Sequence, residues 1–250
     1  MTKRLLAWVV VFSLLFLGWH FVLSARLVSP AVLATPTEVL TSFPRLFLPS
    51  DSLRDTAATI ERSVVAFCLG VPIGVLAGLG IFFGREVRPP AEFTLDFLRS
   101  IPATALVPVF LVVFGVDETA KIAVGAFSAA LVMALSTLAG LVRTNITRAA
   151  VASTLGITGM RRVLLLDIPE ALPQIFLGLR AAASLALILV IVAEMFIGTS
   201  RGLGRVIWDM RYTDDKGMLY AAMVATGVVG YSFNLFIRFA ETRVLHWHGR

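Results

Sequence analysis

Few residues in this sequence carry groups that could do chemistry, and the most informative of them is Glu194. It interrupts an otherwise uncharged apolar stretch, residues 181–200. A carboxylate inside such a stretch is costly to desolvate and usually faces a partner or a polar cavity. Glu194 could pair with Arg201 or Arg205, lie at the edge of its segment, or take part in a solute pathway. The sequence leaves these roles open, and the further polar candidates for a pathway are Ser128 and Ser184.

The familiar motifs of catalysis and metal binding do not occur. The sequence has no G-x-x-x-x-G-K-[ST] phosphate loop, no H-E-x-x-H and no G-x-S-x-G. His20 is far along the chain from His246 and His248, so these histidines are poorly placed to share a site. Cys68 is the single cysteine and cannot form an intrachain disulfide. We expect its thiol to be packed among apolar side chains. We predict no metal site, no cofactor in this chain and no ATP hydrolysis by it alone.

Long apolar segments must position these groups. The chain is 58% hydrophobic and 15% charged, with a mean hydropathy of +0.87, and a helix needs about 20 apolar residues to cross the hydrocarbon of a bilayer. Backbone groups must be satisfied within each segment, which favours helices. We predict an all-α membrane protein with one transmembrane domain over residues 1–250. Its six transmembrane helices should lie at about residues 5–25, 63–83, 100–116, 122–142, 175–198 and 217–237.

Charge distribution predicts the orientation. The first span follows Lys3 and Arg4, is too long for a signal peptide and lacks a cleavage site, so we expect a retained anchor. Six spans place 13 of the 22 lysines and arginines on the side of the N-terminus. The positive-inside rule then makes both termini cytoplasmic. The net charge of +6 reflects this bias, and no soluble basic module suggests a nucleic-acid partner.

Local signals predict helix starts and helix contacts. Thr35 and Glu38 have the spacing of a capping box, so a surface helix should begin at Pro36. We expect the second span to kink at Pro72. A stripe of small residues should let this span approach another helix closely: Gly70, Gly74 and Gly78. A short helix is also expected within residues 200–217, after the fifth span.

Prolines are expected to shape the third span. Ser100 can cap this helix and Pro102 can occupy its first turn. Pro108 then falls inside the helix and should bend it. A bent short helix could line a pathway or could serve packing alone.

The segment "ASTLGITGMRRVLLLDIPEALP", residues 152–173, is more elaborate than a plain connector. We expect a helix over residues 148–155 that ends at a left-handed Gly156, and a second helix capped by Thr158. Pro169 should stop that second helix. Apolar side chains should lie against the membrane bundle: Val163, Leu164 and Leu166. Length and spacing alone are equally consistent with a structural loop and a docking surface.

This segment resembles the cytoplasmic loop of ABC-importer permeases, with its pattern E-A-A-x-x-x-G-x9-I-x-L-P. Gly156 and Pro169 fall on the glycine and the final proline, while Ala150 replaces the glutamate. Four further segments occur along the chain in the same order as in nitrate, sulfonate, taurine and bicarbonate permeases, which they resemble: "LATPTEVL", "LRSIPATALVPVFLVVFG", "DIPEALPQIFLGLR" and "VAEMFIGTSRGLG". The resemblance implies a coupling helix in the loop at residues 143–173, between spans four and five. The expected docking residues are Ala150, Ala152, Ser153, Thr154, Leu155, Gly156, Ile157, Thr158, Gly159 and Met160.

The resemblance also implies a transport complex. The expected partners are a second copy of this chain, two ATP-binding cassette subunits that bind ATP and Mg²⁺, an extracytoplasmic solute-binding protein, and membrane lipid. The location would be the bacterial inner membrane, and the solute a small oxyanion. A permease for a heterocyclic vitamin precursor is the alternative. An intramembrane enzyme fits less well, because a single intramembrane carboxylate offers no converging acid–base pair. A passive channel would pass solute without ATP, and neither class fits the resemblance of the loop to a coupling helix.

Overall fold

The computed structural model describes residues 2–29, 32–48, 50–84 and 86–245 of the 250-residue chain. Within these ranges the secondary structure is helical and no strand is present. Five described helices are long and apolar enough to cross a membrane, or six if a bent pair counts as one span. The predicted all-α membrane fold is therefore confirmed. His246 and His248 lie outside the described residues.

The chain divides into two compact units, the first of which is Met1–Ala58 with Ser200–Gly227. It contains α1 (Thr2–Ser24), α2 (Pro36–Ser42), η1 (Phe43–Leu46), α10 (Leu203–Met210), and the first parts of α3 (Ser50–Phe83) and α11 (Lys216–Val244). The predicted capping box opens α2: the Glu38 amide donates to Thr35 Oγ1 at 3.2 Å, and the Thr35 amide donates to Glu38 Oε2 at 2.8 Å. The core of this unit is formed by Ala34, Val39, Leu46, Leu203, Val206, Ala221, Ala222 and Ala225.

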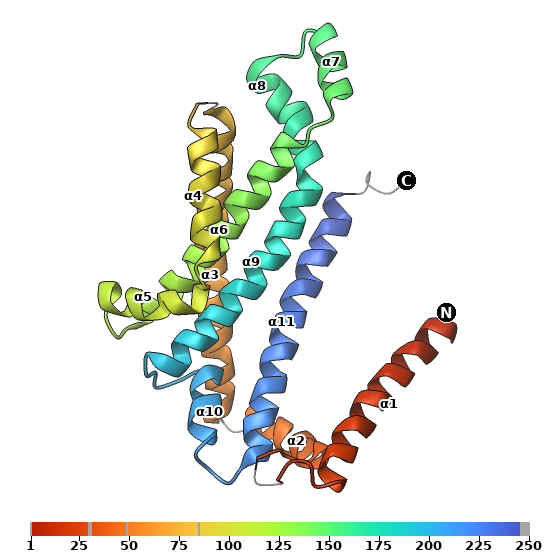
Figure 1. The fold of residues 1–250 in the computed structure, drawn as a ribbon, viewed down its shortest axis with the longest axis vertical. Helices are drawn as coiled ribbons and strands as arrows, with labels where there is room; N and C mark the ends of the chain where they lie inside the picture. Colours follow the sequence, from red (N-terminus) through yellow and green to blue (C-terminus); the bar gives the residue numbers. More distant parts are fainter. Residues whose placement is uncertain (1, 30–31, 49, 85, 246–250) are drawn as a thin grey trace. The chain divides into compact units, whose positions relative to one another are not determined.

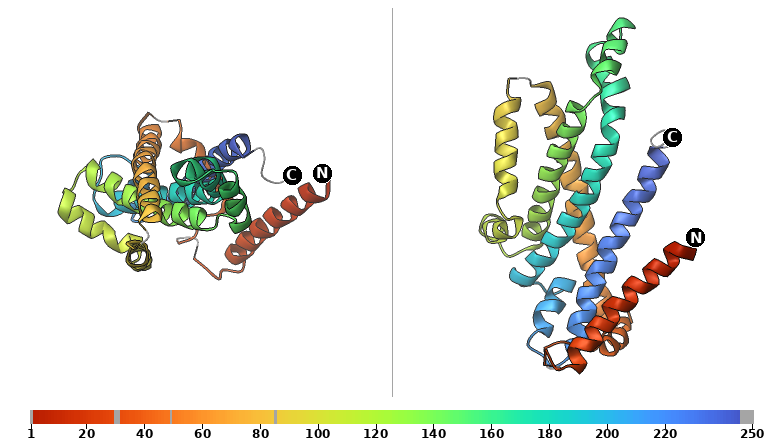
Figure 2. Two further views of the ribbon diagram at one scale, coloured as in Figure 1. Left: turned by 90° about the horizontal axis from the view of Figure 1, so that it is seen from above. Right: turned by 45° about the vertical axis from the view of Figure 1, so that its right-hand side comes forward.

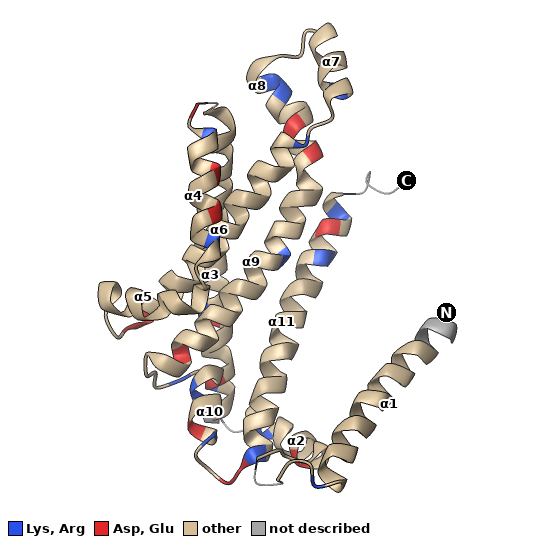
Figure 3. Cartoon of the chain, viewed as in Figure 1, with Lys and Arg blue, Asp and Glu red and all other residues tan. Residues whose placement is uncertain are grey.

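The second unit, Thr59–Thr199 with Val228–Arg250, holds the features that resemble a permease. Besides the later parts of α3 and α11 it contains α4 (Arg88–Ser100), η2 (Ala103–Leu106), α5 (Val107–Phe114), α6 (Glu118–Val142), α7 (Ile146–Thr154), α8 (Gly159–Arg162), the π-helical η3 (Val163–Asp167) and α9 (Ile168–Phe196). Helices α6 and α9 pack along each other, and α7 and α8 project beyond their ends (Figures 1 and 2). Long parts of α6 and α9 carry no charge (Figure 3).

The glycine stripe on α3 packs against α6, as the sequence predicts. A Cβ on Gly70 would come within 2.8 Å of the Ala129 Cβ, and one on Gly78 within 2.7 Å of the Ala134 carbonyl oxygen. Only glycine permits this approach, since real Cβ atoms essentially never come so close. Helix α3 continues through Pro72 as one element.

The predicted third span at residues 100–116 is wrong in its start and in the place of its bend. Ser100 is the last residue of α4 and caps nothing, and α4 and α5 belong to a helix pair bent by 87°. Ile101 is extended at ψ 124°, because the residue before a proline is disfavoured in the α region. Pro108 lies in the first turn of α5, where its missing amide costs nothing. The chain therefore bends before Pro108.

The predicted stop at Pro169 is also wrong. Helix α9 begins at Ile168, has Pro169 in its first turn and continues through Pro173. The Ile168 amide bonds to the Val163 carbonyl five residues back, which widens the helix into a π turn. A proline ring clashes with the carbonyl four residues before it, so the widened turn accommodates Pro169 without ending the helix. The fifth span is therefore longer than the predicted residues 175–198.

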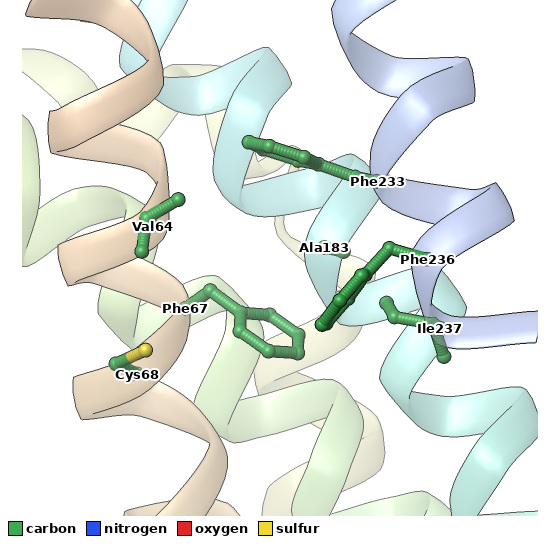
Figure 4. A pocket seen from close by; sticks show the side chains of 7 residues that line it. All are labelled: Val64, Phe67, Cys68, Ala183, Phe233, Phe236 and Ile237. Carbon is green, nitrogen blue, oxygen red and sulfur yellow. The ribbon is translucent and has the colours of Figure 1, made fainter. Parts of the chain in front are cut away.

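Cys68 is not packed inside the protein, contrary to expectation. It is exposed and lines an apolar cavity of about 270 Å³ in the second unit. Side chains from α3, α9 and α11 surround this cavity, and the rings of Phe67 and Phe236 lie across it (Figure 4). Small residues such as Ala183 leave this space, because α9 presents no bulky side chain there.

Candidate functional site

The projecting arm at residues 145–162 begins with a helix that its own sequence caps at both ends. The Asn145 side chain accepts from the amides of Thr147 and Arg148, which starts α7 at Ile146, two residues earlier than predicted. Asn145 was not recognised from the sequence, although an asparagine before a short helix is a standard N-cap. Helix α7 is therefore a defined element of nine residues.

Gly156 ends α7 as predicted, in the left-handed conformation at φ +71°. The Gly156 amide bonds to the Ser153 carbonyl at 3.1 Å, and the Ile157 amide bonds to the Ala152 carbonyl at 2.9 Å. This pair of bonds is the Schellman motif, which satisfies the last carbonyls of a helix and reverses the chain. Thr158 occupies the N-cap position of α8, but its side chain makes no capping hydrogen bond. The arm is thus a helix–turn–helix.

Apolar side chains are displayed on this arm. Leu155 is 71% exposed and Met160 is 60% exposed, and the exposed set also includes Ile146 and Val151. Most of the expected docking residues share this accessibility: Ala150, Ser153, Thr154, Gly156, Thr158 and Gly159 are exposed, and Ile157 is half-buried. Clustered exposed apolar groups mark interaction surfaces on proteins. The arm therefore presents an apolar face suited to another macromolecule.

Two expectations about the arm need correction. Ala152 is buried, so it supports the arm from within and adds nothing to an exposed surface. Leu164 was expected to lie against the bundle but is exposed, whereas Val163 is buried and Leu166 is half-buried. The π turn accounts for this difference, because a wider turn rotates side chains away from the positions that an α-helical period predicts.

Glu194 lies at the other end of α9, 26 residues and about 39 Å along the helix from Ile168. Arg62 Nη1 donates to Glu194 Oε1 at 2.6 Å, and Thr59 Oγ1 donates to Glu194 Oε2 at 2.8 Å. The Glu194 side chain is 0% exposed and that of Arg62 is 8% exposed. The carboxylate is therefore enclosed within the protein and held by α3, and it does not extend to the edge of its segment.

The same arginine reaches a second carboxylate. Arg62 bonds through Nε and Nη2 to Glu118 at the start of α6, and Lys121 Nζ lies 3.0 Å from Glu118 Oε1. Arg62 also donates to Thr199 Oγ1 at 3.3 Å. We call Thr59, Arg62, Glu118, Lys121, Glu194 and Thr199 the Arg62 cluster. Its two cations balance its two carboxylates, so it joins α3, α6 and α9 without net charge.

The sequence pointed to Glu194 but not to its partner. Arg62 was placed outside the second span because the uncharged stretch begins at Ser63. Helix α3 begins at Ser50, however, so Arg62 lies within a helix and can face α9. A sequence signal existed, since Arg62 precedes the glycine-bearing stretch of the same helix. The expected pairing of Glu194 with Arg201 or Arg205, which belong to the first compact unit, stays a prediction.

The serine candidates have different surroundings. Ser184 donates to the Arg180 carbonyl at 3.1 Å and accepts from Asn234 Nδ2 at 3.3 Å, so it connects α9 to α11. It lies ten residues from Glu194, or about 15 Å along α9. Ser128 is buried in α6. A shared pathway site for these residues stays a prediction. In the described part of the chain, no group of three or more His, Cys, Asp or Glu side chains could hold a metal ion.

The long apolar helices define a multi-pass membrane protein, with α7 and α8 projecting beyond the ends of α6 and α9. The chain belongs to the family of inner membrane components of binding-protein-dependent transport systems, whose profile matches residues 70–246. It is therefore a permease subunit of an ABC importer, and in this class the ATPase is a separate subunit.

The chain is similar along most of its length to permease proteins of transport systems. It is 29% identical over 229 residues to the putative aliphatic sulfonates transport permease protein SsuC of Bacillus subtilis strain 168, covering 92% of this chain and 83% of that protein. It is 26% identical over 242 residues to the taurine transport system permease protein TauC of Escherichia coli K12, covering 95% and 88%. The bicarbonate permease CmpB of Synechococcus elongatus is 27% identical over 190 residues, covering 76% and 68%.

Solved structures have the same fold at lower identity. An amino acid ABC transporter chain superposes with a TM-score of 0.65 at 18% identity, over 84% of this chain and 100% of that chain. A chain of the inward-facing MetNI methionine transporter superposes with a TM-score of 0.61 at 18% identity, covering 78% and 97%. These likenesses concern the fold.

Proposed function

We propose that this permease moves a small oxyanion, of the sulfonate, taurine or bicarbonate type, across a bacterial inner membrane. The relatives named for such solutes cover most of this chain, which supports the solute class. A heterocyclic vitamin precursor is the alternative solute. The two are separated by isolating the solute-binding protein that stimulates transport and identifying its bound ligand.

We propose further that the arm at residues 145–162 docks into the ATPase subunit. The observation that carries this proposal is the apolar face of the arm, with Leu155 and Met160 exposed on a capped helix–turn–helix. A short capped helix transmits a rigid-body push without stretching. Two copies of the permease, each bearing one arm, then take two ATPase subunits that bind ATP and Mg²⁺. In this proposal the arm and both termini are cytoplasmic, as the positive-inside rule predicts, and the solute-binding protein acts on the other side of the membrane.

The docking proposal is tested at Gly156. Replacing it with valine places a β-branched residue at φ +71°, which costs about 1–2 kcal/mol or more. Gly156→Asn is the matched control, because asparagine tolerates the left-handed conformation. We expect Gly156→Val to lose co-purifying ATPase subunit and transport while the membrane bundle stays folded, and Gly156→Asn to retain both. Normal ATPase binding and transport by Gly156→Val would contradict docking through this arm.

The Arg62 cluster is proposed as a lock between α3, α6 and α9 at the end of the second unit opposite the arm. The enclosed ion pair of Arg62 with Glu194, extended by the half-exposed Glu118, supports this role. Movement of one of these helices would expose or separate ion pairs that are costly to leave unpaired. The lock therefore resists solute passage until the helices move together.

A further inference from the structure

Glu170 lies at the root of the arm, in the first turn of α9, and both of its carboxylate oxygens are engaged. Oε2 accepts from the Asn145 amide at 2.9 Å, and Oε1 accepts from Arg148 Nη1 at 2.8 Å. The Glu170 side chain is 16% exposed, whereas that of Arg148 is 68% exposed. One largely buried carboxylate thus binds two groups separated from it by more than 20 residues of chain.

The two groups that Glu170 holds are at the start of α7. Asn145 is the N-cap residue, and Arg148 belongs to the first turn that Asn145 caps. Glu170 therefore fixes the residue on which the beginning of α7 depends. Hydrogen bonds to an ionised acceptor are about twice as strong as neutral ones, so the Asn145 bond is a firm attachment.

Along the chain, α7 is joined to its neighbours only by non-helical segments. Residues 143–145 separate it from α6, and the left-handed turn at Gly156 separates it from α8. Helix α8, in contrast, continues through η3 directly into α9. Helices α8 and α9 are therefore parts of one continuous helix. Helix α7 is not, so it needs a tertiary contact to move together with α9.

We propose that Glu170 is the positioning residue that makes α7 move as one body with α9. This inference rests on the proposed docking of the arm. It names the contact that carries force from the docked helix into α9, the long helix that bears Glu194 near its far end. The Asn145 amide bond carries most of the effect. The Arg148 ion pair contributes less, because one partner is exposed and solvent screens it.

The attachment itself is tested in the permease alone by hydrogen exchange of the amides of residues 146–155. We expect Glu170→Ala to speed exchange of these amides about tenfold, since both bonds to α7 are lost. Arg148→Ala and Glu170→Gln should have smaller effects, because each keeps an acceptor for the Asn145 amide. Glu92→Ala, which removes an ion pair with Arg88 on α4, is the matched control and should leave α7 unchanged. Unaltered exchange in Glu170→Ala overturns the inference.

The mechanical role is tested with the assembled transporter in proteoliposomes. Glu170→Ala should still bind the ATPase subunit but should move severalfold fewer solute molecules for each ATP hydrolysed, with partial recovery in Glu170→Gln. A wild-type transport-to-ATP ratio despite a loosened α7 overturns the inference. Failure of docking itself is recognised separately, because Gly156→Val would then bind the ATPase subunit normally. If Glu170→Ala does not fold, the other two variants decide. Both must lower the amount of solute moved per ATP, with a larger loss in Glu170→Gln than in Arg148→Ala, or the inference is wrong.

Discussion

Arg62 on α3 donates a hydrogen bond from Nη1 to Oε1 of Glu194 on α9 at 2.6 Å, and both side chains are buried. The two residues are 132 positions apart in the sequence. Removing one partner of a buried ion pair leaves an uncompensated charge in a poorly solvated site. This pair therefore fixes how α3 and α9 pack at the end of the bundle opposite the arm.

Glu194→Gln should destabilise the permease by about 3 kcal/mol, because the amide keeps the size of the side chain but leaves the Arg62 charge less compensated. The measurement is thermal unfolding of the purified protein in detergent. Glu118→Gln is the control: Glu118 also binds Arg62, but its side chain is 51% exposed, so its loss should matter less. Equal stability of the Glu194 variant and the parent would show that the pair does not hold the helices.

The same Glu194→Gln protein tests the lock at the level of transport. If the pair restrains helix movement, the surviving protein should hydrolyse ATP with less solute moved per ATP. The assay follows both quantities in one proteoliposome preparation that contains the solute-binding protein. Normal coupling in a destabilised variant would assign Glu194 a structural role alone.

Gly74→Ala should weaken the contact between α3 and α6. A Cβ at this position would lie 2.5 Å from the Met133 Cβ and closer still to the Ala130 carbonyl, which predicts a loss of about 1–3 kcal/mol. Gly80→Ala, in the same helix, meets nothing within 4 Å and should be neutral or stabilising by up to about 1 kcal/mol. Thermal unfolding of both variants compares them directly, and a Gly74 variant as stable as the Gly80 variant would refute the packing argument.

The assembled transporter should contain two permease chains in each particle. In the docking proposal each chain supplies one arm, so two ATPase subunits need two permease chains. Mass measurement of the detergent-solubilised complex gives the copy number. A functional particle with a single copy of this chain contradicts the proposal, unless a second and different permease chain takes its place.

Features set by a few neighbouring residues could be predicted from the sequence. The capping box of Thr35 and Glu38 and the left-handed turn at Gly156 depend on local backbone geometry, and both are confirmed. The glycine stripe on α3 was also predictable, because its spacing places the glycines on one face of a helix. The sequence could not name α6 as the helix that meets this stripe.

The sequence analysis missed features that depend on residues far apart in the chain. It also missed a backbone conformation that lets a helix continue through a proline. Arg62 was placed outside the second span, because an uncharged stretch shows where the charged residues end. It does not show where the helix begins, which here is Ser50. Pro169 was read as a stop, although a π turn accommodates it. Glu170 had no motif to identify it, because its role depends on Asn145 folding back across the loop. Such contacts appear only when the tertiary structure is known.

The central claim, that the arm docks into the ATPase subunit, is tested most directly by the affinity of purified permease for that subunit after Leu155→Glu. A charge at the centre of an apolar interface should weaken binding at least tenfold. Leu48→Glu is the control, because Leu48 is 80% exposed and the charge pattern of the sequence puts it on the other side of the membrane. We predict loss of affinity for Leu155→Glu and parental affinity for Leu48→Glu. Parental affinity for both variants would contradict the account.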